Sequence, residues 1–145
     1  MGLELLEVAT VGLPFCGFKL LAGLAMGGPA GAALVALGLV DAVVNAANLI
    51  GLLAWDRRPL PTCSLSFAAG LLRAGTDSLA RWRDLGSALD VLLSFALVAG
   101  MLGFGRLALL PPAHATLWNA CVILNVLGAG LGRLSVSLRG LARAR

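Results

Sequence analysis

The stretch 34–52, LVALGLVDAVVNAANLIGL, decides the fold, because it is almost wholly apolar yet carries three polar side chains. On a helix with about 100° between successive residues, Asp41, Asn45 and Asn48 fall within an arc of about 60°. A carboxylate that faces hydrocarbon is costly, so this polar stripe must be turned toward other helices. The stretch therefore predicts a membrane-embedded helix that packs its polar side inside a group of helices.

The composition of the whole chain agrees with this interpretation. Of the 145 residues, 59% are hydrophobic and only 12% are charged, whereas soluble domains average about 25% charged residues. No segment shows the alternating polarity of a membrane β-barrel strand. The length suits one domain. We therefore expect an all-α integral membrane protein, with a four-helix transmembrane bundle of two hairpins forming a single domain over residues 1–145.

The apolar segments are long enough for four spans at a rise of about 1.5 Å per residue. They are separated by a Gly–Gly–Pro turn, a polar connection and a Pro–Pro pair, and Pro14 predicts a kink inside the first span. In the polar connection 56–84, apolar residues recur at helical spacing, which predicts one or two amphipathic helices on the membrane surface, interrupted at 75–77. The expected spans are residues 3–26, 29–55, 85–110 and 116–138.

The basic residues predict the orientation. Five of the 11 Lys and Arg residues lie in the connection 56–84, and four lie from Arg133 onward. Four spans place both regions on the same side, and the positive-inside rule makes that side the cytoplasm, together with both termini. The Ala-, Leu-, Gly- and Arg-rich usage is typical of a high-GC bacterial genome, so we expect the membrane to be a bacterial inner membrane. We expect the basic residues to bind anionic lipid headgroups rather than nucleic acid.

A set of polar side chains at mid-membrane depth is the main candidate site. One interpretation is structural, because Asn side chains that hydrogen-bond across membrane helices contribute about 0.6–2 kcal/mol each and fix the register of the helices. The alternative is a proton or ion relay, because intramembrane acids often line such paths. The expected members of this cluster are Asp41, Asn45, Asn48, Asn119 and Asn125.

Further charged side chains lie inside the expected spans. Asp90 and Arg133 have comparable depths on the third and fourth spans, which predicts an ion pair that holds the second hairpin together. Lys19 lies in the second half of the first span. It either extends its ammonium to the nearer interface or forms an ion pair with Asp41 or Glu7.

Glycines recur at the spacing that lets membrane helices approach closely. Gly23 and Gly27 fit the G-x-x-x-G pattern, and so do Gly128 and Gly132. These two pairs predict tight helix packing, either within the chain or against a partner.

No residue pattern for catalysis is visible. The three cysteines are far apart, there is a single histidine, and the sequence contains no Ser–His–acid set or phosphate-binding loop. We expect no metal, no cofactor and no enzymatic activity. The first hypothesis is a non-catalytic accessory or assembly subunit that packs against other membrane subunits, in which Asp41→Asn is nearly silent. The alternative is a small transporter or proton-linked channel, working as a homo-oligomer, in which the same change abolishes flux.

Overall fold

All elements of the described residues are helical. The computed structural model describes residues 2–61, 63–72 and 79–143 of the chain. Four helices are long and apolar enough to cross a membrane: Gly2–Met26, Gly28–Trp55, Arg81–Gly103 and Pro112–Ser135. In chain order the elements are α1 (Gly2–Glu7), the π-helical turn η1 (Val8–Gly12), α2 (Leu13–Met26), α3 (Gly28–Trp55), α4 (Ser64–Leu72), α5 (Leu79–Gly103), the 3₁₀ turn η2 (Arg106–Leu109) and α6 (Pro112–Arg143).

The first span passes through Pro14 without ending. Proline has no N–H to donate to the carbonyl four residues earlier, and the wider π-helical turn η1 lies directly before it. Thr10, inside this turn, donates its hydroxyl to the Leu6 carbonyl at 2.7 Å. Where the sequence predicted a kink, the helix therefore widens locally into a π-helical turn. The elements α1, η1 and α2 continue as one span.

The first two spans have the predicted bounds to within two residues, but the last two differ. The third long helix begins at Leu79 and ends at Gly103, earlier than the expected 85–110, and Gly105 then adopts a left-handed backbone (φ +64°) before the 3₁₀ turn. The fourth begins at Pro112 and continues to Arg143, beyond the expected 116–138. Proline is well tolerated in the first turn of a helix, where its missing N–H would have no partner anyway.

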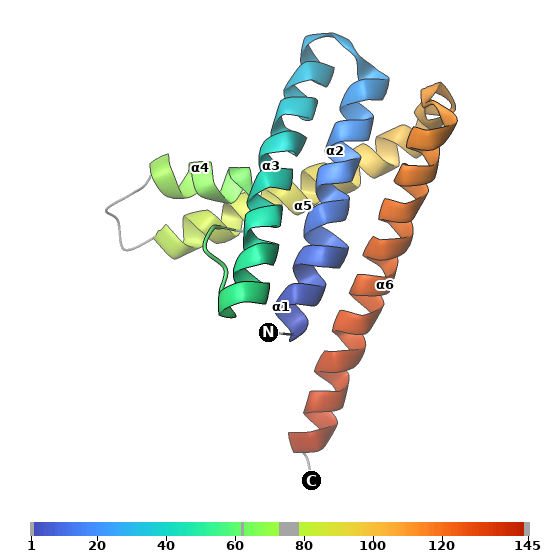
Figure 1. Cartoon of the computed structure of the whole chain (residues 1–145). Helices are drawn as coiled ribbons and strands as arrows, with labels where there is room; N and C mark the ends of the chain where they lie inside the picture. Colours follow the sequence, from blue (N-terminus) through green and yellow to red (C-terminus); the bar gives the residue numbers. More distant parts are fainter. Residues whose placement is uncertain (1, 62, 73–78, 144–145) are drawn as a thin grey trace.

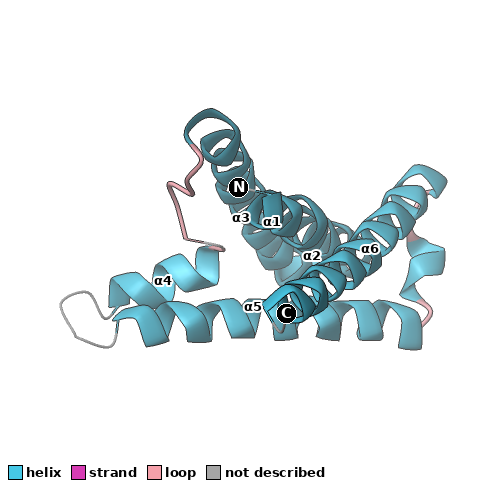
Figure 2. Ribbon diagram, turned by 90° about the horizontal axis from the view of Figure 1, so that it is seen from below, coloured by secondary structure: helices cyan, strands magenta, loops and turns pink. Residues whose placement is uncertain are grey.

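The central element of the structure is α2. It packs against α3, α5 and α6, and the turn at Gly27 sets α3 alongside it in the opposite direction (Figure 1). The helix α5 crosses behind the others obliquely, as the view from below also shows (Figure 2). The N-terminus and the ends of α3 and α6 lie toward one end of the molecule, as four spans require.

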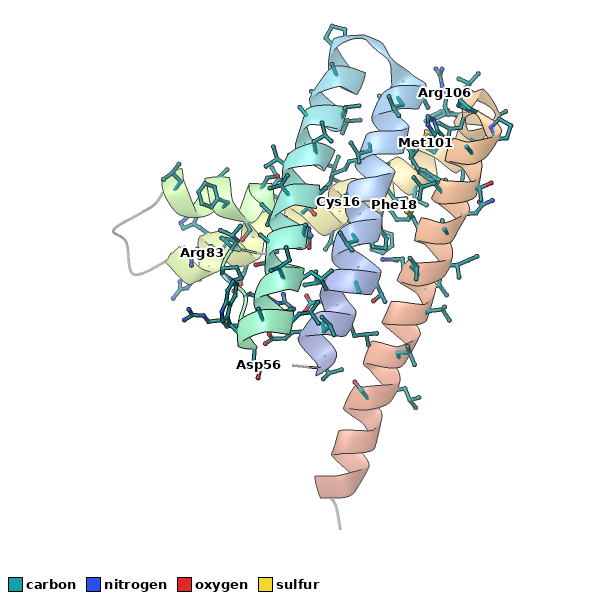
Figure 3. All side chains as sticks on the ribbon, in the orientation of Figure 1. Cys16, Phe18, Asp56, Arg83, Met101 and Arg106 are labelled. Carbon is teal, nitrogen blue, oxygen red and sulfur yellow. The ribbon has the colours of Figure 1, made fainter. Side chains whose placement is uncertain are left out.

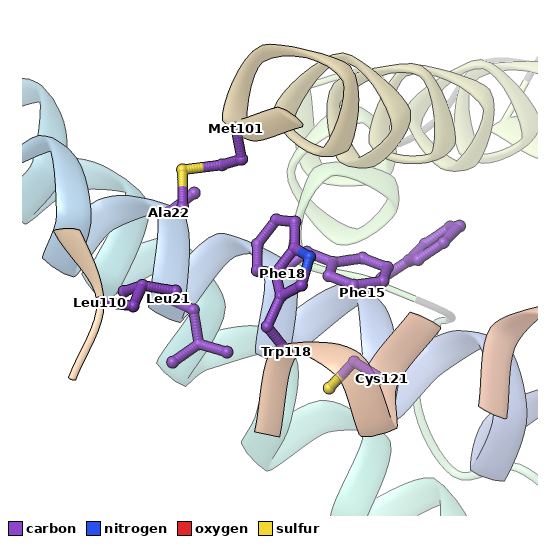
Figure 4. Packing of buried hydrophobic residues seen from close by; sticks show 8 residues of the cluster. All are labelled: Phe15, Phe18, Leu21, Ala22, Met101, Leu110, Trp118 and Cys121. Atoms are coloured by element: carbon purple, nitrogen blue, oxygen red, sulfur yellow. The ribbon is translucent and has the colours of Figure 1, made fainter. Parts of the chain in front are cut away.

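The apolar core joins α2 to the end of α5 and the start of α6 (Figure 4). The rings of Phe18 and Trp118 are 4.9 Å apart, and Phe15 meets Phe95 of α5 edge-on at 5.7 Å. Aromatic pairs at these separations contribute beyond their buried area. The buried members of this core are Phe15, Phe18, Leu21, Ala22, Met101, Leu110, Trp118 and Cys121.

The polar connection contains one short helix that docks on protein. The helix α4 packs against the first half of α5, and a Cβ atom added at Gly86 would lie 2.6 Å from the Leu65 carbonyl oxygen. Phe67 and Leu71 on α4 remain exposed. The predicted interruption at 75–77 lies outside the described residues.

Only one glycine of each predicted packing pair lies at a close helix contact. A Cβ at Gly23 would lie 2.6 Å from the Gly31 carbonyl oxygen, and one at Gly128 would lie 1.9 Å from the Thr10 hydroxyl oxygen. Gly27 instead forms the turn between α2 and α3 with φ +63°, and a Cβ at Gly132 would meet nothing within 4 Å. The spacing identified the helices that approach closely, but it did not identify the partner of each contact.

Candidate functional site

Three buried charged side chains from three helices meet in one cluster. Lys19 of α2 donates hydrogen bonds from Nζ to Asp41 Oδ2 of α3 and to Asp90 Oδ1 of α5. The three residues are 0%, 1% and 6% exposed, respectively. Lys19 therefore does not extend to the interface, and its alternative prediction, an ion pair with Asp41, is confirmed. We call these three residues the triad.

Asp90 pairs with a cation of α2, Lys19. The predicted pair with Arg133 assumed that consecutive helices pack side by side. In the structure both α5 and α6 pack against α2 instead, and Asp90 lies where α5 passes close to Lys19. The structure thus gives Asp90 the partner Lys19, where the sequence predicted Arg133.

Asp41 also binds the start of α4. Its Oδ1 atom accepts a hydrogen bond of 2.6 Å from the backbone N–H of Ser64, the first residue of that helix. The first N–H groups of a helix have no partner within the helix and favour a negative charge nearby. Asn45, one turn further along α3, donates to the Asp41 carbonyl at 2.9 Å and lies 3.5 Å from the Cys16 sulfur. Asp41 therefore joins α2, α3 and α4.

Asn48 holds the segment that follows α3. Its Nδ2 atom donates to the Pro61 carbonyl at 3.2 Å, and its Oδ1 atom accepts from the Leu60 N–H at 3.0 Å. Asp56 ends α3 in a left-handed conformation with φ +53°, and a Cβ at Gly51 would lie only 2.5 Å from Pro59. The segment 56–61 therefore folds back along the last turns of α3, and we call it the strap.

A cavity of about 140 Å³ connects the triad with the strap. This volume can hold several water molecules. At the strap, the Arg58 Nη2 atom donates to Glu7 Oε2 at 2.7 Å and to the Glu4 carbonyl at 3.2 Å. The charged residues that line the cavity are Glu7, Lys19, Asp41, Arg58 and Asp90. With all of them ionised, three carboxylates face two cations.

Of the predicted polar cluster, the structure brings together the three residues on α3 but not the two on α6. Asp41, Asn45 and Asn48 share one buried face, as their spacing predicted. Asn119 is exposed, and Asn125 is half-buried and does not line the cavity. The buried face of α6 carries Trp118, Cys121 and Gly128, and Asn119 is turned by about 100° around the helix from Trp118, the nearest of these three.

Lys19 and Asp90 complete the site; the sequence pairs Lys19 with Asp41 only as one alternative, and it pairs Asp90 with Arg133. Their charge inside an apolar segment was the available signal, and only the crossing of α5 over α2 brings them together. Arg106, a cation inside the expected third span, lies at the opposite end of the molecule from Asp56 and is exposed (Figure 3).

Two cysteines lie at the same cavity. Cys16 and Cys63 both line it, whereas Cys121 packs against Gly17 on another side of α2. Within residues 2–61, 63–72 and 79–143, no three His, Cys, Asp or Glu side chains are grouped as metal ligands would be.

Cys63 is expected to react slowly with alkylating reagents. Burial raises the pKa of its thiol above the usual value of 9.0, and the thiolate is the reactive form. In a variant that keeps only this cysteine, the rate of iodoacetamide labelling in detergent should increase about tenfold per pH unit up to pH 9. Glutathione provides the reference thiol. A rate that levels off below pH 8 would contradict the expectation.

The fold and the site define a multi-pass helical membrane protein with an ionic cluster buried among its spans. Comparison of this chain with protein-family models, with curated proteins and with solved structures gives no match.

Proposed function

We propose that this chain is a small proton-linked membrane carrier or channel, in which the triad binds and releases a proton. The observation that supports this function best is the position of two buried carboxylates around one ammonium, at the end of a cavity that both charged and apolar residues line. Two carboxylates and one ammonium leave one negative charge uncompensated. One bound proton would balance this charge.

The surroundings of the triad support proton exchange rather than a purely structural role. A structural ion pair needs matched charges and satisfied hydrogen bonds, and excess charge destabilises it. The titratable groups that face the triad are Cys16 on α2, Cys63 before α4, and Glu7 and Arg58 at the far side of the cavity. The cavity provides space for water between these groups and the triad, and water can carry a proton along that path.

We further propose that the chain lies in a bacterial inner membrane, with both termini and the connection 56–84 in the cytoplasm. The basic residues concentrate in that connection and at the C-terminal end. Arg57, Arg81 and Arg83 are exposed, so they are available to contact anionic lipid headgroups. In this orientation the cavity with Glu7 and Arg58 faces the cytoplasmic side.

Proton flux into liposomes tests the proposal. The purified chain is reconstituted, a pH gradient is imposed, and the internal pH is followed with a trapped dye. We expect Asp41→Asn and Asp90→Asn to lower the flux by at least about tenfold, because each removes one acid from the proton site. Asn119→Ala, at an exposed position of α6, should keep wild-type flux. Flux that is absent from the wild type, or equal in all four proteins, would refute the proposal.

A non-catalytic accessory subunit is a second candidate, and a different observation supports it. Within the most apolar 18-residue stretch of each span, 56% is buried in the first helix, but only 22%, 22% and 17% in the second, third and fourth helices. A groove of about 700 Å³ between α2, α5 and η2 is lined mainly by apolar residues. Native mass spectrometry from a gentle detergent separates the two functions. Unrelated membrane subunits in fixed stoichiometry favour the accessory function, and a monomer or homo-oligomer favours the carrier.

A further inference from the structure

We propose that the strap, residues 56–61, is a gate over the cavity and that Arg58 is its latch. This inference deepens the proposed function, because the gate would control access to the proposed proton site. The inner part of the strap is anchored through Asn48, whose side-chain amide both donates to and accepts from the strap backbone. The outer part is held by Arg58, which reaches across to α1.

The two attachments differ in how easily they can break. Asn48 is fully buried, so breaking its two hydrogen bonds would leave polar groups without partners. At the other attachment, the Glu4 and Glu7 side chains are 55% and 58% exposed, against 18% for Arg58. An ion pair with exposed carboxylates contributes little net stability, because water can replace either partner. The strap should therefore open at Arg58 while Asn48 keeps it attached.

The Arg58 contacts leave room for such movement. Its Nε atom is buried without a hydrogen-bond partner and lies 3.8 Å from Glu4 Oε2, beyond hydrogen-bonding distance. Arg58 and Glu7 both line the cavity, so a guanidinium that swings away would open the cavity at this side. The groups exposed to that opening are the remaining lining residues, which include Cys16 on α2.

Labelling of Cys16 measures this opening directly. A chain that keeps Cys16 as its only cysteine is reconstituted into liposomes and treated with a small charged methanethiosulfonate reagent, which does not cross membranes. The Arg58→Gln variant should be labelled about three- to tenfold faster than the parent chain, because the latch is lost. Glu7→Ala should also increase the rate, since it removes the carboxylate that accepts from Arg58 Nη2 at 2.7 Å.

A second single-cysteine chain is the matched control. Cys121 is also buried, but it packs against Gly17 and does not line the cavity. Its labelling should be unchanged by Arg58→Gln. Equal rates for Cys16 with and without the latch would overturn the gate, and faster labelling of both cysteines would show general loosening and overturn it too. The measurement does not require flux, so a gate without proton transport would refute only the proposed function.

Discussion

Replacement of Lys19 by Met is expected to lower the free energy of unfolding by about 3–5 kcal/mol. The change removes the only cation of the triad and leaves Asp41 and Asp90, both buried, on either side of an apolar side chain. By contrast, the triple variant Lys19→Met, Asp41→Leu and Asp90→Leu removes every charge at once. We expect it to be as stable as the wild type or more stable, because the cost of burying the charges disappears with their attraction.

The triple variant also separates stability from function. Unfolding is followed by circular dichroism during a titration from a mild detergent into dodecyl sulfate, for the wild type, Lys19→Met and the triple variant. A carrier predicts that the triple variant folds but moves no protons in liposomes. If the triple variant is destabilised as much as Lys19→Met, or if it retains flux, the triad does not act as proposed. Asn119→Ala serves again as the control for handling and reconstitution.

Gly23→Ala is expected to destabilise the protein by about 1–3 kcal/mol, although alanine is the better helix former. The added methyl group would lie 2.6 Å from the Gly31 carbonyl oxygen and 2.9 Å from the Val35 backbone nitrogen. Backbone atoms of a packed helix cannot rotate away as a side chain can, so α2 and α3 must separate. These two helices carry Lys19 and Asp41, and their separation would weaken the triad as well.

Gly132→Ala is the matched substitution, since a Cβ at Gly132 meets nothing within 4 Å. It should leave the stability unchanged or raise it by up to about 1 kcal/mol through helix propensity. Both variants are compared by thermal unfolding in the same detergent. Equal effects at the two positions would mean that α2 and α3 do not approach as closely as described.

The four spans and the polar face of α3 could be predicted from the sequence, because both depend on local patterns. Apolar segments of sufficient length give the spans, and a helical period places Asp41, Asn45 and Asn48 on one face. The triad could not be predicted in full, since Lys19 and Asp90 are 71 positions apart in the chain. Their contact depends on the oblique crossing of α5 over α2, which no local pattern encodes.

The errors on α6 have the same origin. Asn119 and Asn125 have suitable depths for a contact with Asp41, but depth does not specify the direction of a side chain around its helix. The side of α6 that packs on α2 is decided by Trp118, Cys121 and Gly128, which fit against Phe18, Gly17 and Thr10. The face that α6 turns toward α2 is thus set by the packing of large against small residues and not by the positions of its Asn side chains.

The hydrogen bond from the Ser64 N–H to Asp41 connects the buried triad directly to the start of α4. A protonated carboxyl group is a weaker acceptor than a carboxylate, so in the proposed proton site a proton on Asp41 would weaken the hold on the first peptide group of α4. The same helix rests on α5 at Gly86, close to Asp90 along the chain. A single acid deep among the spans is thereby linked to the position of a surface helix whose Phe67 and Leu71 are exposed.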